Sequence, residues 1–71
     1  MDQRPARVAL LVCPACGQQH TVRVDAPRTR VACGAWAAAS HTNGGVEARV
    51  WVPGDGRLAG RMAFLIDVRR V

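Results

Sequence analysis

Three cysteines are the residues of this chain best suited to chemistry. Residues 13–17 read Cys-Pro-Ala-Cys-Gly, which places Cys13 and Cys16 on one tight turn closed by Gly17. Two thiolates at this spacing supply half of a tetrahedral zinc site, and Cys33 offers a third ligand. An odd number of cysteines excludes a complete set of intramolecular disulfides. We therefore expect a reduced protein that binds one Zn²⁺ rather than a disulfide framework.

The fourth ligand must be something other than cysteine. Imidazole and thiolate combine in Cys3His sites, and the chain has two histidines. We expect His41 to complete the site if residues 35–41 fold back as a short helix. His20, close behind Cys16 in the sequence, is the alternative. The further readings are a fourth ligand from water or a partner, and a metal-free protein in which the thiols pack as small apolar groups.

Other chemistry has little support in the sequence. A redox Cys-x-x-Cys dithiol places its first cysteine at a helix N-terminus, whereas a strand pattern follows this turn. The five acidic residues are scattered, and no glycine-rich phosphate loop follows a strand. The adjacent Ser40 and His41 do not make a catalytic triad. We expect a protein that is not an enzyme and takes no small-molecule substrate.

The elements that position the first two cysteines are two predicted strands. Residues 7–12 are rich in strand formers, and residues 20–25 alternate between apolar and polar side chains. Together they predict a hairpin with the cysteine turn at its tip. The first strand is expected to place Val8, Leu10 and Val12 on one face, and the second to point Val22 and Val24 inward.

The rest of the chain predicts a third short strand, one short helix and a second hairpin. Residues 29–33 form the strand, and residues 35–41 have the only real helix propensity. Residues 46–52 and 62–68 alternate on either side of a Pro-Gly-Asp-Gly turn. The residues expected on the inner faces are Val46, Ala48, Val50, Val52, Met62, Phe64, Ile66 and Val68.

Size and composition predict one small, mainly β domain over residues 1–71. Residues 1–6 read as a lead-in, residues 8–36 as a hairpin with two cysteine turns, and residues 46–70 as the C-terminal hairpin. Apolar residues make up 49% of the chain, but alanine and valine dominate and build a thin core. Small domains of this kind often need a metal or a partner for stability.

Residues 8–36 resemble a zinc ribbon, a β-hairpin with two Cys-x-x-Cys-Gly knuckles. The first knuckle matches the form Cys-Pro-x-Cys-Gly at every position, but the second, within residues 30–36, lacks one cysteine. If Cys33 ends that knuckle, Arg30 stands in the place of the first cysteine. If Cys33 opens it, Trp36 stands in the place of the second. The resemblance implies a small antiparallel sheet and a non-catalytic docking role.

The net charge of +5 favours anionic partners, namely nucleic acid or an acidic protein face. All ten basic residues are arginine, which a GC-rich coding bias would also produce. Arginine beside an exposed tryptophan is typical of single-stranded nucleic-acid surfaces and of protein hot spots. The residues expected on such a binding surface are Arg23, Arg49, Trp51 and Arg69.

We expect a small subunit or adaptor that docks onto a larger protein assembly, such as a polymerase, a ribosome-associated complex or a viral particle. The alternative is a zinc ribbon that binds nucleic acid through the arginine and tryptophan side chains of that expected binding surface. No signal peptide is visible, and no apolar run could cross a bilayer. We therefore expect an intracellular protein, or one within an intracellularly assembled particle, with no membrane partner.

Overall fold

The computed structural model describes residues 6–70, so most of the expected lead-in at residues 1–6 lies outside the described part. The described residues form one antiparallel sheet of six strands, in the order β2-β1-β6-β5-β4-β3. The mainly β fold expected from the sequence is confirmed. The strands are β1 (Arg7–Val12), β2 (Gln19–Arg23), β3 (Thr29–Arg30), β4 (Trp36–Thr42), β5 (Gly45–Trp51) and β6 (Arg61–Arg70).

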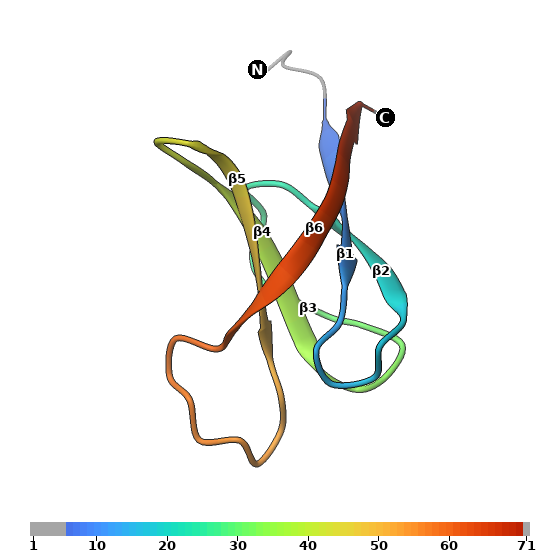
Figure 1. The fold of residues 1–71 in the computed structure, drawn as a ribbon, viewed down its shortest axis with the longest axis vertical. Coiled ribbons are helices and arrows are strands. Elements are labelled where there is room, and N and C mark those ends of the chain that lie inside the picture. The colour runs from blue at the N-terminus through green and yellow to red at the C-terminus, as the bar shows by residue number, and fades with distance from the viewer. Residues whose placement is uncertain (1–5, 71) are drawn as a thin grey trace.

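Strand β6 joins the two halves of the sheet. Its first residues, Arg61–Ala63, pair with β5, and its later residues, from Phe64 to Arg70, pair with β1 (Figure 1). The C-terminal hairpin expected at 46–70 therefore exists over a short stretch only. A parallel bridge between Val24 and Ala39 also brings the end of β2 against β4, so the sheet curls over its own inner face.

The inner face of the curled sheet holds a core of small side chains. Six of its ten buried residues are alanines, so the packed volume is small. A core of this size stabilises a fold weakly, because stability scales with the apolar area removed from water. The buried residues are Ala9, Leu11, Cys13, Val22, Ala35, Ala37, Ala39, Ala48, Val50 and Ala63.

The expectation of a helix at residues 35–41 is wrong, because residues 36–41 belong to strand β4. Ala37 and Ala39 point into the core and lie opposite Val50 and Ala48 of β5. Tertiary pairing thus overrides the weak helix propensity of an alanine run. Across residues 6–70 the structure contains no helix that is long and apolar enough to cross a membrane.

The expected side-chain faces of β6 are wrong for most of the strand. Ala63 and Leu65 pack inward, while Met62, Phe64 and Ile66 are exposed. The register of β6 against β1 shifts by one residue between Leu10 and Leu11, where Leu65 and Asp67 are the successive partners. This bulge returns Val68 to the core, because one extra residue reverses the alternation beyond it.

The expectation that Val8, Leu10 and Val12 share one face of β1 is confirmed, and that face is the outer one. Ala9, Leu11 and Cys13 are fully buried, whereas Val8, Leu10 and Val12 are only partly buried on the outer face. Both sets are apolar, so the pattern could not distinguish the faces. In β2 the expected inward position of Val22 is confirmed, and Val24, which directly follows the strand, also packs against the core as expected.

Candidate metal centre

The turn between β1 and β2 is shaped by three bonds to Cys13. Its backbone N–H donates to the carbonyl of Gln18 (2.9 Å), and its carbonyl accepts from Gly17 (2.8 Å). The N–H of Ala15 donates to the Cys13 sulfur (3.4 Å). Gly17 adopts a φ of 75°, which glycine adopts without strain. The turn therefore places Cys16 back beside Cys13.

The loop between β3 and β4 repeats this turn with one residue fewer. Val31 donates to the carbonyl of Ala35 and accepts from the N–H of Gly34, both at 2.8 Å. Gly34 has a φ of 90°, so it closes this loop as Gly17 closes the first. Val31 thus holds the backbone position that Cys13 holds in the first turn.

This pattern decides between the two alignments of the second knuckle. Cys33 directly precedes the closing glycine, so it ends the turn, as Cys16 does in the first. The first position belongs to Val31 rather than to Arg30, and it packs against the core. Trp36 does not replace a cysteine, because it lies on β4 with its ring exposed.

The two turns meet and bring four donor atoms together. The Sγ atoms of Cys13, Cys16 and Cys33 and a ring nitrogen of His20 all lie within 4.8 Å of one another. The sulfurs of Cys13 and Cys33 are 3.7 Å apart, and the Cys16 sulfur lies 3.3 Å from His20 Nε2. His20 reaches the cluster because it lies opposite the buried Leu11 and so faces inward. These four residues form a cluster that could bind a metal ion.

His41, which we expected as the fourth ligand, is not in this cluster. It lies on β4 and bonds Asp25: its backbone N–H donates to Oδ1 (3.0 Å), and its Nδ1 contacts Oδ2 (2.5 Å). The route from Cys33 to His41 required a helix that β4 does not form. The structure favours the alternative ligand, His20.

The local environment shifts the pKa values of Cys16 and Cys33 in opposite directions. The backbone N–H of Ala35, with help from the neighbouring thiols and His20, lowers the pKa of Cys33 to about 7. At Cys16 the backbone N–H of Gln18 favours the thiolate, but desolvation and the neighbouring thiols outweigh it and raise the pKa. A cation placed among the sulfurs would favour the thiolate form of all three.

The expected binding-surface residues fall into two separate pairs. Arg23 and Arg69 both lie opposite Val8, on either side of β1, and Arg69 pairs with Asp67 (2.8 Å). Arg49 lies opposite Met62 of β6, so about 20 Å of strand separates it from Arg69.

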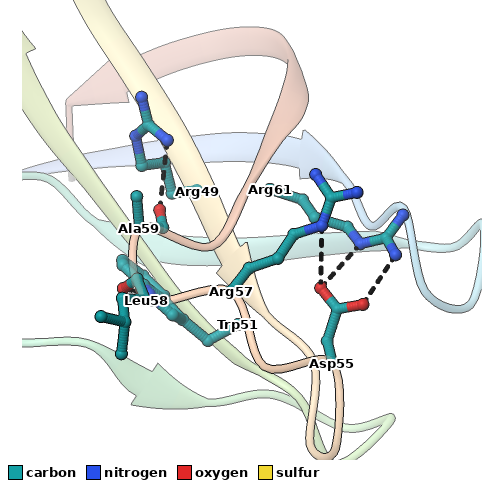
Figure 2. A network of polar contacts seen from close by, with 7 residues as sticks. All are labelled: Arg49, Trp51, Asp55, Arg57, Leu58, Ala59 and Arg61. Atoms are coloured by element: carbon teal, nitrogen blue, oxygen red, sulfur yellow. Dashed lines mark hydrogen bonds and ion pairs between the residues drawn. The ribbon is translucent and has the colours of Figure 1, made fainter.

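Arg49 and Trp51, the second pair, are engaged by the loop between β5 and β6. Arg49 donates to the carbonyl of Ala59 (3.1 Å), and the Trp51 indole N–H donates to that of Leu58 (2.9 Å; Figure 2). Both side chains therefore hold the loop in place. The expected surface does not form as a single patch.

Sequence reasoning missed a different set of exposed residues around Trp36. Trp36 lies directly opposite Trp51, and Arg30 lies opposite Trp36 on the next strand. The signal would have been the alternation of residues 36–42, which was masked because alanine suits a helix as well as a strand.

Comparison of the chain with protein-family models, with curated proteins and with solved structures found no significant match.

Proposed function

We propose that this chain is a small, non-catalytic binding module whose two turns are held together by one Zn²⁺ on Cys13, Cys16, His20 and Cys33. The proposal rests on the convergence of three thiols and one imidazole. Three soft sulfur donors with one nitrogen are a preferred ligand set for zinc. The resemblance of residues 8–36 to a zinc ribbon supports the same ligand chemistry.

The spacing of the donors supports a tetrahedral ion. Bonds of ~2.3 Å from zinc to sulfur and ~2.0 Å to nitrogen place tetrahedral ligands about 3.5–3.8 Å apart. The separation of the Cys13 and Cys33 sulfurs is 3.7 Å, and that of the Cys16 sulfur and His20 Nε2 is 3.3 Å. The four donor atoms all lie within 4.8 Å of one another, so side-chain shifts of about 1 Å would close the site.

Four protein ligands favour a structural role for the metal. Catalytic zinc sites keep a position open for water or substrate, whereas this set fills all four. The ion would cross-link the β1–β2 turn to the β3–β4 loop, and so supplement a core built largely of alanine.

The outer face of β6 supports docking onto a protein as the module's role. Met62, Phe64 and Ile66 are exposed there, Phe64 by 73%, and Phe64 lies beside the half-buried Val12 of β1. We call Val12, Met62, Phe64 and Ile66 the β6 strip. A contiguous exposed apolar surface of this kind is typical of interaction sites. The partner would be a component of a larger protein assembly.

Elemental analysis combined with native mass spectrometry tests the metal centre. We expect one zinc per chain in the purified protein and loss of that zinc in the variant Cys33→Ser. A protein that folds with no metal, or a variant that keeps its full zinc content, would contradict the proposal.

Affinity purification from the source cells tests the docking role. Phe64→Ser should lose a stoichiometric protein partner while keeping its zinc. The matched control is Leu58→Ser, since Leu58 is 96% exposed but lies on the β5–β6 loop rather than on the β6 strip. Equal recovery of the partner with the wild type, Phe64→Ser and Leu58→Ser would exclude the β6 strip as the docking surface.

A further inference from the structure

Three strands on the other half of the sheet line up arginine and tryptophan on one outer face. Arg30 of β3 lies opposite Trp36 of β4, which lies opposite Trp51 of β5. Residues directly opposite in an antiparallel pair point to the same side. The next pair along, Ala37 and Val50, is buried, so the row of Arg30 and the two tryptophans faces outward.

Each tryptophan of this row has a guanidinium over its ring. The Arg28 Cζ lies 3.9 Å from the centroid of Trp51, and the Arg30 Cζ lies 5.9 Å from that of Trp36. Cation–π attraction at these distances orders the arginine side chains beside the rings. We call Arg28, Arg30, Trp36 and Trp51 the arginine–tryptophan face.

The two tryptophans differ in how firmly they are held. Trp51 is partly buried, and its indole N–H donates to the carbonyl of Leu58 (Figure 2). It also packs so closely on Gly60 that a Cβ added to this glycine would lie 2.9 Å from the Trp51 ring. Trp36 is 41% exposed. The Trp51 ring is thus held in a fixed position under the Arg28 guanidinium. Part of the Trp36 ring stays exposed and can stack on another planar group.

The charge of this face is positive, because the nearby acids already have partners. Asp55 is paired with Arg61 (2.7 Å) and Arg57 (3.5 Å), as Figure 2 shows. Glu47 is paired with Arg49 (3.5 Å). Within residues 6–70, no ion pair involves Arg28 or Arg30.

We propose that the arginine–tryptophan face binds single-stranded nucleic acid, with a base stacked on Trp36 and adjacent phosphates contacted by Arg28 and Arg30. An exposed ring can stack only on a base that is free of its own duplex, so a single strand fits this face better than a double helix. The proposal goes beyond docking through the β6 strip, since it uses different residues and a different ligand.

Fluorescence anisotropy with labelled twelve-nucleotide oligo-dT and oligo-U tests this face on the zinc-loaded chain. Two phosphate contacts predict that the logarithm of the affinity falls with the logarithm of salt with a slope of about −1.4. Trp36→Ala should weaken binding by about five- to a hundredfold, while Trp36→Phe keeps most of it. Arg30→Gln should reduce the slope by about 0.7.

Arg69→Gln is the matched control, because it removes the same charge from the other end of the sheet and should leave the affinity nearly unchanged. Phe64→Ser should also bind the oligonucleotides normally, which separates this face from the β6 strip. Zinc content is measured for every variant. If Trp36→Ala loses zinc, the double variant Arg28→Gln/Arg30→Gln tests the proposal in its place. In this double variant the affinity for the oligonucleotides should no longer depend on salt.

Three results would overturn the proposal. One is the absence of oligonucleotide binding by the zinc-loaded protein at low salt. Another is unchanged affinity in a zinc-loaded Trp36→Ala or in the double arginine variant. The third is an equal loss from Arg69→Gln and Arg30→Gln, which would indicate unspecific attraction to net positive charge.

Discussion

His20 and His41 serve different parts of the molecule although both lie in strands of the same sheet. His20 points inward beside three sulfurs, while His41 bonds an exposed carboxylate, that of Asp25, which follows β2. The position of the ring relative to the cysteines, rather than the residue type, decides which histidine can act as a metal ligand. This difference can be tested by exchanging each one in turn.

His20→Ala should lower the zinc affinity by at least about 100-fold, because even partners outside the ligand shell contribute 10- to 100-fold. His41→Ala should leave the affinity unchanged. Competition with a chromogenic zinc chelator measures both constants. Equal affinities for the two variants would show that His20 is not a ligand.

Asp25 predicts a specific acid dependence of stability. The backbone N–H of His41, followed by its side chain, lowers the pKa of this carboxyl below its ordinary value of 3.8. The stabilisation is therefore fully present above about pH 4 and is lost as the pH falls through the lowered pKa. Asn at this position keeps the shape and tolerates the positive φ of 60°, but loses the charge.

The measurement is urea unfolding of the zinc-loaded wild type and Asp25→Asn at pH 7 and in steps down to the lowest pH at which both proteins keep their zinc. We expect the variant to be less stable at pH 7, and the difference between the two proteins to begin to shrink as the pH approaches 4. Equal stability of the two proteins at pH 7 would mean that the charge of Asp25 does not contribute.

At the level of single residues, much of the candidate metal centre could be predicted from the sequence. The three cysteines and the two candidate histidines could be named from the sequence, and His20 lies two residues before Val22, which was expected to face inward. The choice between the histidines could not be made. It depends on the path of residues 35–41, which long-range pairing with β5 determines.

Among the elements, the loop from residue 52 to residue 60 is held by side-chain contacts with the strands it connects. Arg61 donates two hydrogen bonds to Asp55, at 3.0 and 2.7 Å (Figure 2). Gly60 packs against Trp51. The contact at Gly60 is tight enough to make the end of this loop sensitive to a single methyl group.

Gly60→Ala should destabilise the protein by about 2–4 kcal/mol, because it combines backbone strain at a φ of 70° with a clash against Trp51 and the carbonyl of Val50. Gly54→Ala is the matched control. Its φ is 81°, but nothing lies within 4 Å of an added Cβ, so it should cost only about 1–2 kcal/mol. Denaturant unfolding of both variants measures the difference, and equal losses would refute the predicted clash.

Most strands could be predicted from the sequence, and two failures have local causes. Alanine carries little information about secondary structure, so residues 36–42 read as a helix until their pairing with β5 is known. The bulge in β6 leaves no mark in the sequence apart from the apolar Ala63 and Leu65 at positions expected to face outward. Sequence alternation assumes an unbroken pleat, and one extra residue invalidates it.

For the molecule as a whole, the small core implies that the proposed metal contributes much of the folding free energy. Removing zinc with a chelator at neutral pH should abolish the β-sheet signal in circular dichroism, and added zinc should restore it. Tryptophan emission, which reports on Trp36 and Trp51, should shift to longer wavelength at the same time. A chelated protein that keeps its spectrum would mean that the alanine-rich core is sufficient alone.

The sharing of β6 between β1 and β5 has a consequence for how the chain folds as it is synthesised. All four donors of the candidate metal centre lie between residues 13 and 33, so they leave the ribosome well before β6 exists. The metal-binding turns can thus form on a short nascent chain, while β1 keeps one edge unpaired until residues 61–70 arrive. Closing the sheet is the last and most non-local step, and it joins strands about as far apart in sequence as the described chain allows.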